Sequence, residues 1–173
     1  MTWEPFELHP EVPVEGIPLE QYFAGRGVSV GQMQTSLKQR AQELGLPFTG
    51  SSLVISTRPA LVVSEFVREK HPERYEELHH GLFQAYFVHS RNLAQEAEVE
   101  AVCQQLGFAP GMVAEAMAEP KYAAVIERSM EQARAYGING VPTWIVNDKY
   151  KVVGAQPFEV LRDAFQKIDA MGE

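Results

Sequence analysis

Cysteine is nearly absent from this sequence of 173 residues, which contains only Cys103. One thiol excludes an internal disulfide, a Cys-x-x-Cys redox pair and a cysteine-rich zinc site within these residues. Cys103 shares the helical spacing of Val99 and Leu106, which are apolar. We therefore expect a buried and chemically inert thiol.

Positive charge is also scarce. The chain has 15 lysines and arginines against 23 aspartates and glutamates, a formal net charge of -8 and an isoelectric point near 5.2. Nucleic acids and anionic membrane surfaces attract clustered lysine and arginine, and the few basic clusters here are short and interrupted by acids. We expect neither nucleic acid nor a membrane as a partner.

Long hydrophobic runs are missing as well. No stretch approaches the length needed to span a bilayer, and residues 1–5 show neither the basic region nor the apolar region of a signal peptide. The sequence therefore predicts a cytoplasmic protein, on this observation alone.

Several catalytic motifs are absent. There is no glycine-rich phosphate loop and no Gly-x-Ser-x-Gly elbow, so no nucleotide cofactor is expected. The adjacent hydroxyl residues Ser51 and Ser52, and Ser56 and Thr57, are better explained by helix capping and loop hydrogen bonds than by nucleophilic chemistry.

Histidines raise the question of a metal site. Glu76 and His79 lie one helical turn apart, and His80 is adjacent. The second such pair that a two-metal site would require is absent. We expect solvated histidines on a helix face and no bound metal.

What the sequence does contain is an ordinary globular composition, with 45% hydrophobic and 22% charged residues. The length suits one domain carrying an insertion. The residue pattern predicts an edge strand at 3–8 and helices at 19–24, 29–44, 57–70 and 75–87. After a polar link at 89–92 it predicts a helix that carries residues 99, 102 and 106, a short segment from 110 and a helix at 122–136. A hairpin with strands 143–146 and 150–153 and a helix from 158 to 168 complete the chain.

This order, with one strand, many helices, a hairpin and a last helix, indicates an α/β protein with an insertion. We predict an incomplete domain made of residues 1–29 and 136–173, which the four segments below identify by resemblance as thioredoxin-like. Residues 30–135 would form an all-helical insertion domain.

Four segments resemble the DsbA-like branch of thioredoxin-fold proteins, and more narrowly its FrnE-type dithiol oxidoreductases. They are Gly-Ile-Asn-Gly-Val-Pro-Thr-Trp at 137–144, Val-Gly-Ala-Gln-Pro at 153–157, the residues 3–8 with the proline-rich loop that follows, and Gln-Ala-Tyr-Phe at 84–87. The resemblance implies a cis bond at Val141-Pro142. It also implies a substrate-binding site at Val141, Pro142 and Thr143, where an extended client segment pairs with the backbone.

The sequence departs from this family at its start. Family members begin with a strand and a Cys-x-x-Cys at the start of a helix, and no such segment precedes Trp3. The resemblance therefore supplies no catalytic residue. The expected function is a relative of protein disulfide oxidoreductases and isomerases that is redox-inactive as this chain, with peptide or protein thiol clients as possible partners.

Two other functions remain open. A glutathione-linked isomerase or transferase of the kappa type would use a serine or cysteine at the start of the first helix, which belongs to the same absent segment. A non-catalytic interaction module would recruit a strand from a partner to an exposed sheet edge.

The absent strand has a structural consequence. In a thioredoxin sheet it lies between the second strand and the hairpin, so unpaired backbone groups remain on both sides. We expect either direct pairing of residues 3–8 with 143–146 or a homodimer, and of these we favour the homodimer.

Overall fold

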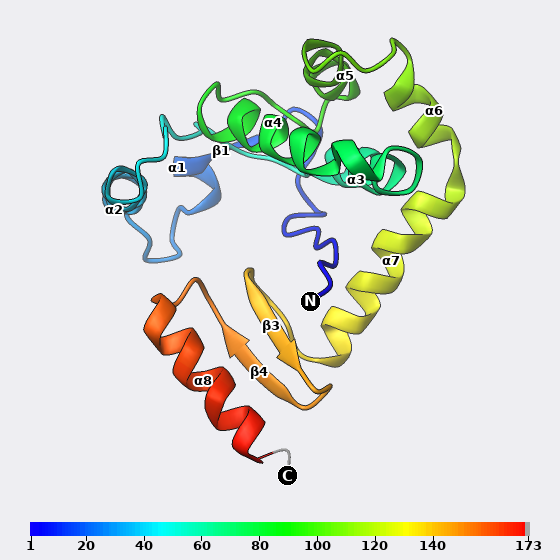
Figure 1. Ribbon diagram of the computed structural model, residues 1–173. Coiled ribbons are helices and arrows are strands. Elements are labelled where there is room, and N and C mark those ends of the chain that lie inside the picture. The colour runs from blue at the N-terminus through cyan, green and yellow to red at the C-terminus, as the bar shows by residue number, and fades with distance from the viewer. Residues whose placement is uncertain (172–173) are drawn as a thin grey trace.

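The computed structural model describes residues 1–171 of the chain (Figure 1). The α-helices are α1 (Leu19–Tyr22), α2 (Val30–Glu43), α3 (Arg58–Lys70), α4 (Tyr75–Phe87), α5 (Glu96–Gln105), α6 (Met112–Ala118), α7 (Pro120–Ala135) and α8 (Phe158–Met171), with a 3-10 turn η1 (Pro72–Arg74). The strands are β1 (Ile17–Pro18), β2 (Leu53–Val54), β3 (Thr143–Val146) and β4 (Tyr150–Val153). The predicted helices and both hairpin strands are confirmed.

Local capping sets the helix boundaries. The Ser29 side chain accepts a hydrogen bond from the Gln32 backbone N–H at 3.4 Å, which satisfies a free donor in the first turn of α2. Helix α3 has Pro59 in its first turn and ends before His71, because the residue before a proline avoids helical backbone angles.

The hydrophobic core lies between helices α3 to α7. Its fully buried members include Val63, Leu78, Val99, Val113 and Ile126, one from each of these five helices. All members of this core fall within residues 55–126. The division into domains at residues 29/30 and 135/136 stays a prediction.

The predicted strand at 3–8 does not form. A β-strand forms only where its backbone is hydrogen-bonded to a neighbouring strand. Here residues of helices α3 and α7 contact the backbone of this segment instead. The Trp3 carbonyl accepts from Arg68 of α3 at 3.0 Å, and the Pro5 carbonyl accepts from Ser129 of α7 at 2.6 Å. The Glu7 N–H contacts the Met130 sulfur at 3.3 Å. Side chains of two helices therefore take the bonds that a strand would supply.

Two small sheets replace the single sheet of the sequence-based expectation. Strand β1 pairs antiparallel with β2, and β3 pairs antiparallel with β4. The predicted pairing of residues 3–8 with 143–146 is absent within residues 1–171. The N-terminal segment instead runs between α3 and β3, where the Trp3 and Trp144 rings lie 5.7 Å apart.

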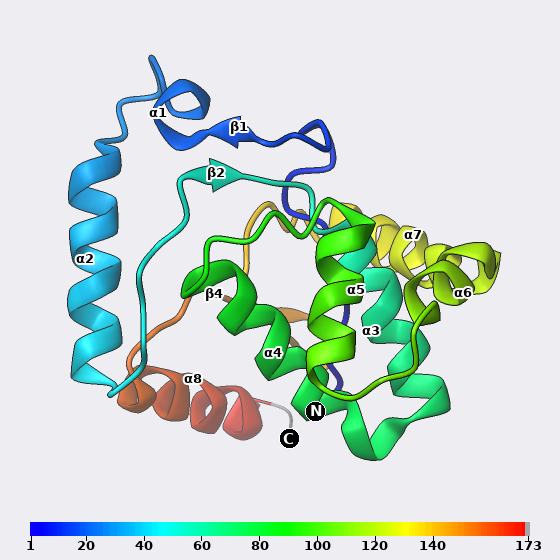
Figure 2. The same cartoon turned by 90° about the horizontal axis from the view of Figure 1, so that it is seen from above.

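Helix α7 connects the helical core to the hairpin and α8 (Figure 1). The view from above shows α2 on one flank, with α3, α5 and α6 on the other (Figure 2). Helix α8 packs on β4 and buries Ile168, whereas Phe158 at its start is 73% exposed. No helix among the described residues is long and apolar enough to cross a membrane.

Candidate functional site

The turn between α7 and β3 places the residues that the sequence singled out. After α7, Gly137 adopts a positive φ of 61°, and the Ile138 N–H donates to the Ala133 carbonyl at 2.8 Å. The Lys151 ammonium on β4 donates to the Tyr136 and Gly137 carbonyls at 3.1 and 3.2 Å. These bonds tie the end of α7 to the hairpin and fix the point at which the next segment begins.

Val141, Pro142 and Thr143 follow as one short surface segment. The Val141-Pro142 peptide bond is cis, and Val141 is 53% exposed. The Thr143 hydroxyl donates to the Gly140 carbonyl at 2.7 Å. Within residues 1–171 the backbone N–H and C=O of Val141 have no hydrogen-bond partner.

The hairpin register shows which backbone groups of β3 face outward. The Gly154 N–H donates to the Pro142 carbonyl at 2.8 Å, so residue 142 directs its carbonyl toward β4. Thr143 pairs with Val153 one step further. In an antiparallel ladder the hydrogen-bonded positions alternate, so the N–H and C=O groups of Thr143 and Ile145 point away from β4.

No other strand of the described chain pairs with that outer side of β3. We call the unpaired backbone groups of Val141 and the outward backbone groups of Thr143 and Ile145 the open edge. It is a row of donors and acceptors spaced to pair with an extended peptide.

The side chain of Trp144 borders the open edge. Its ring contacts Trp3 and, at 6.0 Å and edge to face, Phe165 of α8. Its indole N–H is buried and has no partner in the part of the chain that the structure describes. A tryptophan N–H usually finds an acceptor when it is buried, so this unsatisfied donor is an exception to the rule.

The N-terminal segment presents a second unpaired row. The backbone of this segment contacts side chains of α3 and α7 through Trp3, Pro5 and Glu7, as described above. The backbone groups of Glu4 and Phe6, which alternate with them, have no hydrogen-bond partner among residues 1–171.

Cys103 is completely buried on α5, as expected. Burial raises the pKa of its thiol to about 12, with a smaller contribution from the nearby Glu100 carboxylate. The thiolate is the form that attacks disulfides, and it is almost absent at neutral pH. The only cysteine of these 173 residues is therefore inert, and no intramolecular dithiol pair exists in them.

Ser51 and Ser56 form hydrogen bonds in their loops, and the acceptor of the Ser56 hydroxyl is distant in the chain. Ser51 accepts from the Leu53 N–H at 3.1 Å and donates to the Leu53 carbonyl at 3.0 Å. Ser56 donates to Glu7 at 2.9 Å. Ser52 and Thr57 form no side-chain hydrogen bond among residues 1–171.

The histidines of α4 do not gather into a metal site. No group of three or more His, Cys, Asp or Glu side chains in the described range is placed to share an ion. His79 instead lies between Tyr75 and Phe83, with ring centroids 5.4 and 4.9 Å away. The residue remains exposed, and partial desolvation of its ring lowers its pKa, with Arg68 and His80 adding to the effect.

Sequence reasoning missed this aromatic row. Tyr75, His79, Phe83 and Phe87 recur every four residues, and such positions are neighbours on a helix. The spacing could have revealed the row. No local signal reveals the buried carboxylate of Glu7, because its partners are more than forty residues away in the chain.

Helices α2 to α7, then an antiparallel hairpin and a closing helix, form a helix-rich thioredoxin-like arrangement. The model of the DSBA-like thioredoxin domain matches residues 1–166. The chain belongs to this family, and it is thereby related to disulfide oxidoreductases. No curated protein matches the sequence.

Solved structures agree with this assignment. A candidate DsbA oxidoreductase from Streptomyces coelicolor is 26% identical, with a TM-score of 0.78 over 97% of this chain and 74% of that protein. A candidate protein disulfide isomerase from Nitrosomonas europaea is 19% identical, with a TM-score of 0.64 over 83% and 74% of the two chains. The cytosolic disulfide reductase DsbM from Pseudomonas aeruginosa, solved with GSH, is 19% identical, with a TM-score of 0.54 over 82% and 78%.

Proposed function

We propose that this chain is a redox-inactive, FrnE-type member of the DsbA-like family that binds an extended segment of a protein client at the open edge. Val141, Pro142 and Thr143 would begin the binding site, and the backbone of Ile145 would extend it. The observation that carries this proposal is the row of unpartnered backbone groups on the outer side of β3.

Strand addition explains how such a site works without a catalytic thiol. An extended peptide satisfies the free N–H and C=O groups of a sheet edge, and its backbone supplies affinity for many sequences. The second row at Glu4 and Phe6 gives the same peptide further acceptors and donors. Clients that need no covalent step, such as reduced and unfolded proteins, fit this site.

A second copy of the chain is the competing occupant of the open edge, and the homodimer remains our proposal for the protein without a client. In a symmetric dimer, the free backbone N–H and C=O groups of one β3 edge form hydrogen bonds with those of the partner's β3 edge. We propose the cytoplasm as the compartment.

A titration with an unfolded probe tests the client proposal. The probe is reduced, carbamidomethylated α-lactalbumin, which has no free thiol and is acidic like this chain, so charge attraction cannot account for binding. Binding is followed by the fluorescence anisotropy of a dye attached to the probe, because the tryptophans of α-lactalbumin would mask the emission of Trp144 and Trp3 at the open edge. We expect a saturable change.

Two matched proline variants locate the binding surface. Ile145→Pro removes an outward N–H on β3 and keeps the bonds to β4, which edge strands tolerate. Val153→Pro removes the corresponding N–H on the outer side of β4. We expect Ile145→Pro to lose at least about tenfold in affinity and Val153→Pro to bind as the original protein does. Equal binding by both folded variants, checked by circular dichroism, would contradict the proposal.

A further inference from the structure

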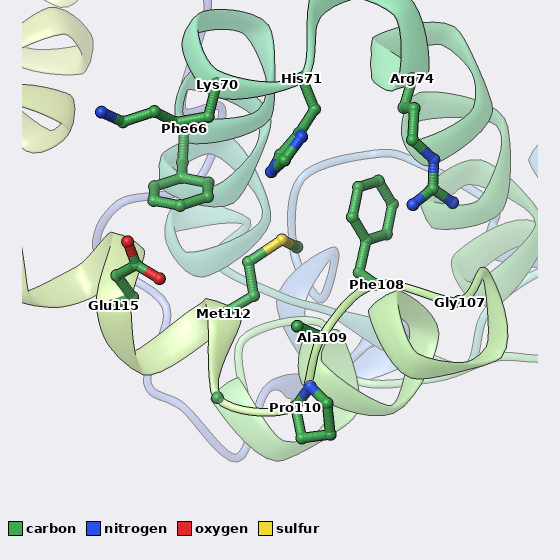
Figure 3. Close-up of a pocket in the computed structure, with 11 residues that line it drawn as sticks. Phe66, Lys70, His71, Arg74, Gly107, Phe108, Ala109, Pro110, Met112 and Glu115 are labelled. Carbon is green, nitrogen blue, oxygen red and sulfur yellow. The ribbon is translucent and has the colours of Figure 1, made fainter.

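A half-open surface pocket of about 450 Å³, called the cavity below, lies on the helical part of the chain, and none of its lining residues belongs to the hairpin. It is formed by the C-terminal end of α3, the turn η1, the loop 107–111 and the first turn of α6 (Figure 3). Its volume falls in the range of small-molecule sites.

The floor of the cavity is apolar. Phe66, Phe108 and Met112 belong to the hydrophobic core and are between 3% and 6% exposed, so each presents only a small part of its side chain to the pocket (Figure 3). Flat rings beside a thioether suit an aromatic or aliphatic body, because the thioether makes favourable contacts with ring edges.

Contacts within the protein hold the Arg74 side chain in one wall of the cavity. The Arg74 guanidinium lies 3.7 Å above the Phe108 ring and donates to the Leu106 carbonyl at 2.5 Å through Nη2. Its Nε donates to Glu77 at 2.9 Å. Its Nη1 has no hydrogen-bond partner within residues 1–171. A positioned guanidinium with spare N–H groups is suited to a carboxylate.

The loop that closes the cavity is fixed as well. The Phe108 N–H donates to the Cys103 carbonyl at 3.0 Å. At the other end, the Gly111 and Val113 N–H groups donate to the Glu100 carboxylate at 2.7 and 3.1 Å. The cavity is therefore preformed, which lowers the entropic cost of binding.

His71 supplies a second donor. Its ring lies 6.5 Å from Phe66 and 6.1 Å from Phe108 and points into the cavity (Figure 3). Neither ring nitrogen has a hydrogen-bond partner in residues 1–171. Glu115 lies on the side away from Arg74, next to Phe66, so an anion is favoured at the end with His71 and Arg74.

We propose that this cavity binds a small aromatic carboxylic acid. The ring of the acid packs on Phe66, Phe108 and Met112, and its carboxylate accepts hydrogen bonds from His71 and from Nη1 of Arg74.

Titrations with phenylacetate and with its neutral analogue phenylacetamide, followed by ¹H–¹⁵N NMR of the full chain, test the proposal. We expect saturable shifts at residues 66–74 and 107–115 with phenylacetate, and at least about tenfold weaker binding of phenylacetamide. Shifts confined to other residues, or equal affinity for the acid and the amide, would overturn it.

Three variants sharpen the result. His71→Ala should weaken phenylacetate binding about threefold or more, since its ring is exposed and water competes for the bond. Glu115→Gln should strengthen it, because a nearby negative charge is removed. His80→Ala, an exposed histidine outside the cavity, is the matched control and should leave it unchanged. A folded His71→Ala protein that binds phenylacetate as the original does would refute the role of His71.

Discussion

The Glu7 carboxylate forms an ion pair of 2.9 Å with the Arg58 guanidinium, and its side chain is only 4% exposed. Arg58 also pairs with Glu127 of α7, and Ser56 donates to the other Glu7 oxygen at 2.9 Å. One buried carboxylate thus joins the N-terminal segment to α3, and through Arg58 to α7. Removing one partner of such a pair leaves an uncompensated charge in a poorly solvated place.

Arg58→Met should therefore lower the free energy of unfolding by about 3 kcal/mol, the lower end of the range for buried pairs, because Arg58 is partly exposed. Urea unfolding measures this. Arg40→Met, which breaks a pair with more than half of each side chain exposed, is the control and should change stability by less than about 0.5 kcal/mol. Similar losses for both variants would show that the Glu7 pair contributes little.

The purified chain should neither reduce insulin nor oxidise dithiols above background. Exchange requires an attacking thiolate and a resolving thiol, and the only cysteine is buried with a thiol pKa of about 12. Ellman's reagent should label Cys103 only after the protein unfolds. Turnover that disappears in Cys103→Ser would contradict this prediction and make Cys103 catalytic.

The same thiol makes stability depend on pH in the alkaline range. The folded pKa of Cys103 lies above the unfolded value of about 9, so the unfolded state loses its proton first and is favoured as pH rises from about 9 to 12. Tyrosines and lysines titrate there too, so the comparison is between the original chain and Cys103→Ala. The stability of the variant should decline less steeply from pH 8 to pH 10.5. Parallel declines would mean that Cys103 is not desolvated in the folded state.

His79 should make the protein acid-sensitive. Partial desolvation lowers its folded pKa below 6.5, so the unfolded state binds the proton more readily and stability falls as pH drops through the unfolded value. His79→Phe keeps a ring between Tyr75 and Phe83 and removes the titration. The melting temperature of this variant should change less between pH 7.5 and pH 5 than that of the original chain. His80→Phe, at another exposed position of the same helix, is the control and should leave the difference in melting temperature between pH 7.5 and pH 5 unchanged.

Size-exclusion chromatography with light scattering tests the homodimer. The open edge of β3 and the exposed side chains of Val141 and Phe158 favour association. We expect a dimer at micromolar concentration, shifted toward monomer by Ile145→Pro. A monodisperse, folded monomer of the original chain would exclude the homodimer and leave the open edge free for a client.

Local chemistry in the sequence determined much of this fold. The N-cap at Ser29, the prolines that begin and end α3, and the hairpin turn all act within a few residues. Asn147 and Asp148 adopt φ values of 53° and 52°, which the turn requires and which these two residue types tolerate better than most. The burial of Cys103 also followed from its spacing, because one face of an amphipathic helix meets the core.

The tertiary structure alone decided what residues 3–8 become. Their alternating pattern is typical of a strand, but a strand exists only where a neighbour completes its ladder, and here Arg68, Ser129 and Met130 take the backbone bonds instead. The burial of Glu7 has the same origin. The cavity at His71 and Arg74 likewise depends on a loop some thirty-five residues further along the chain, and no local pattern encodes contacts between segments that meet only when the helices pack.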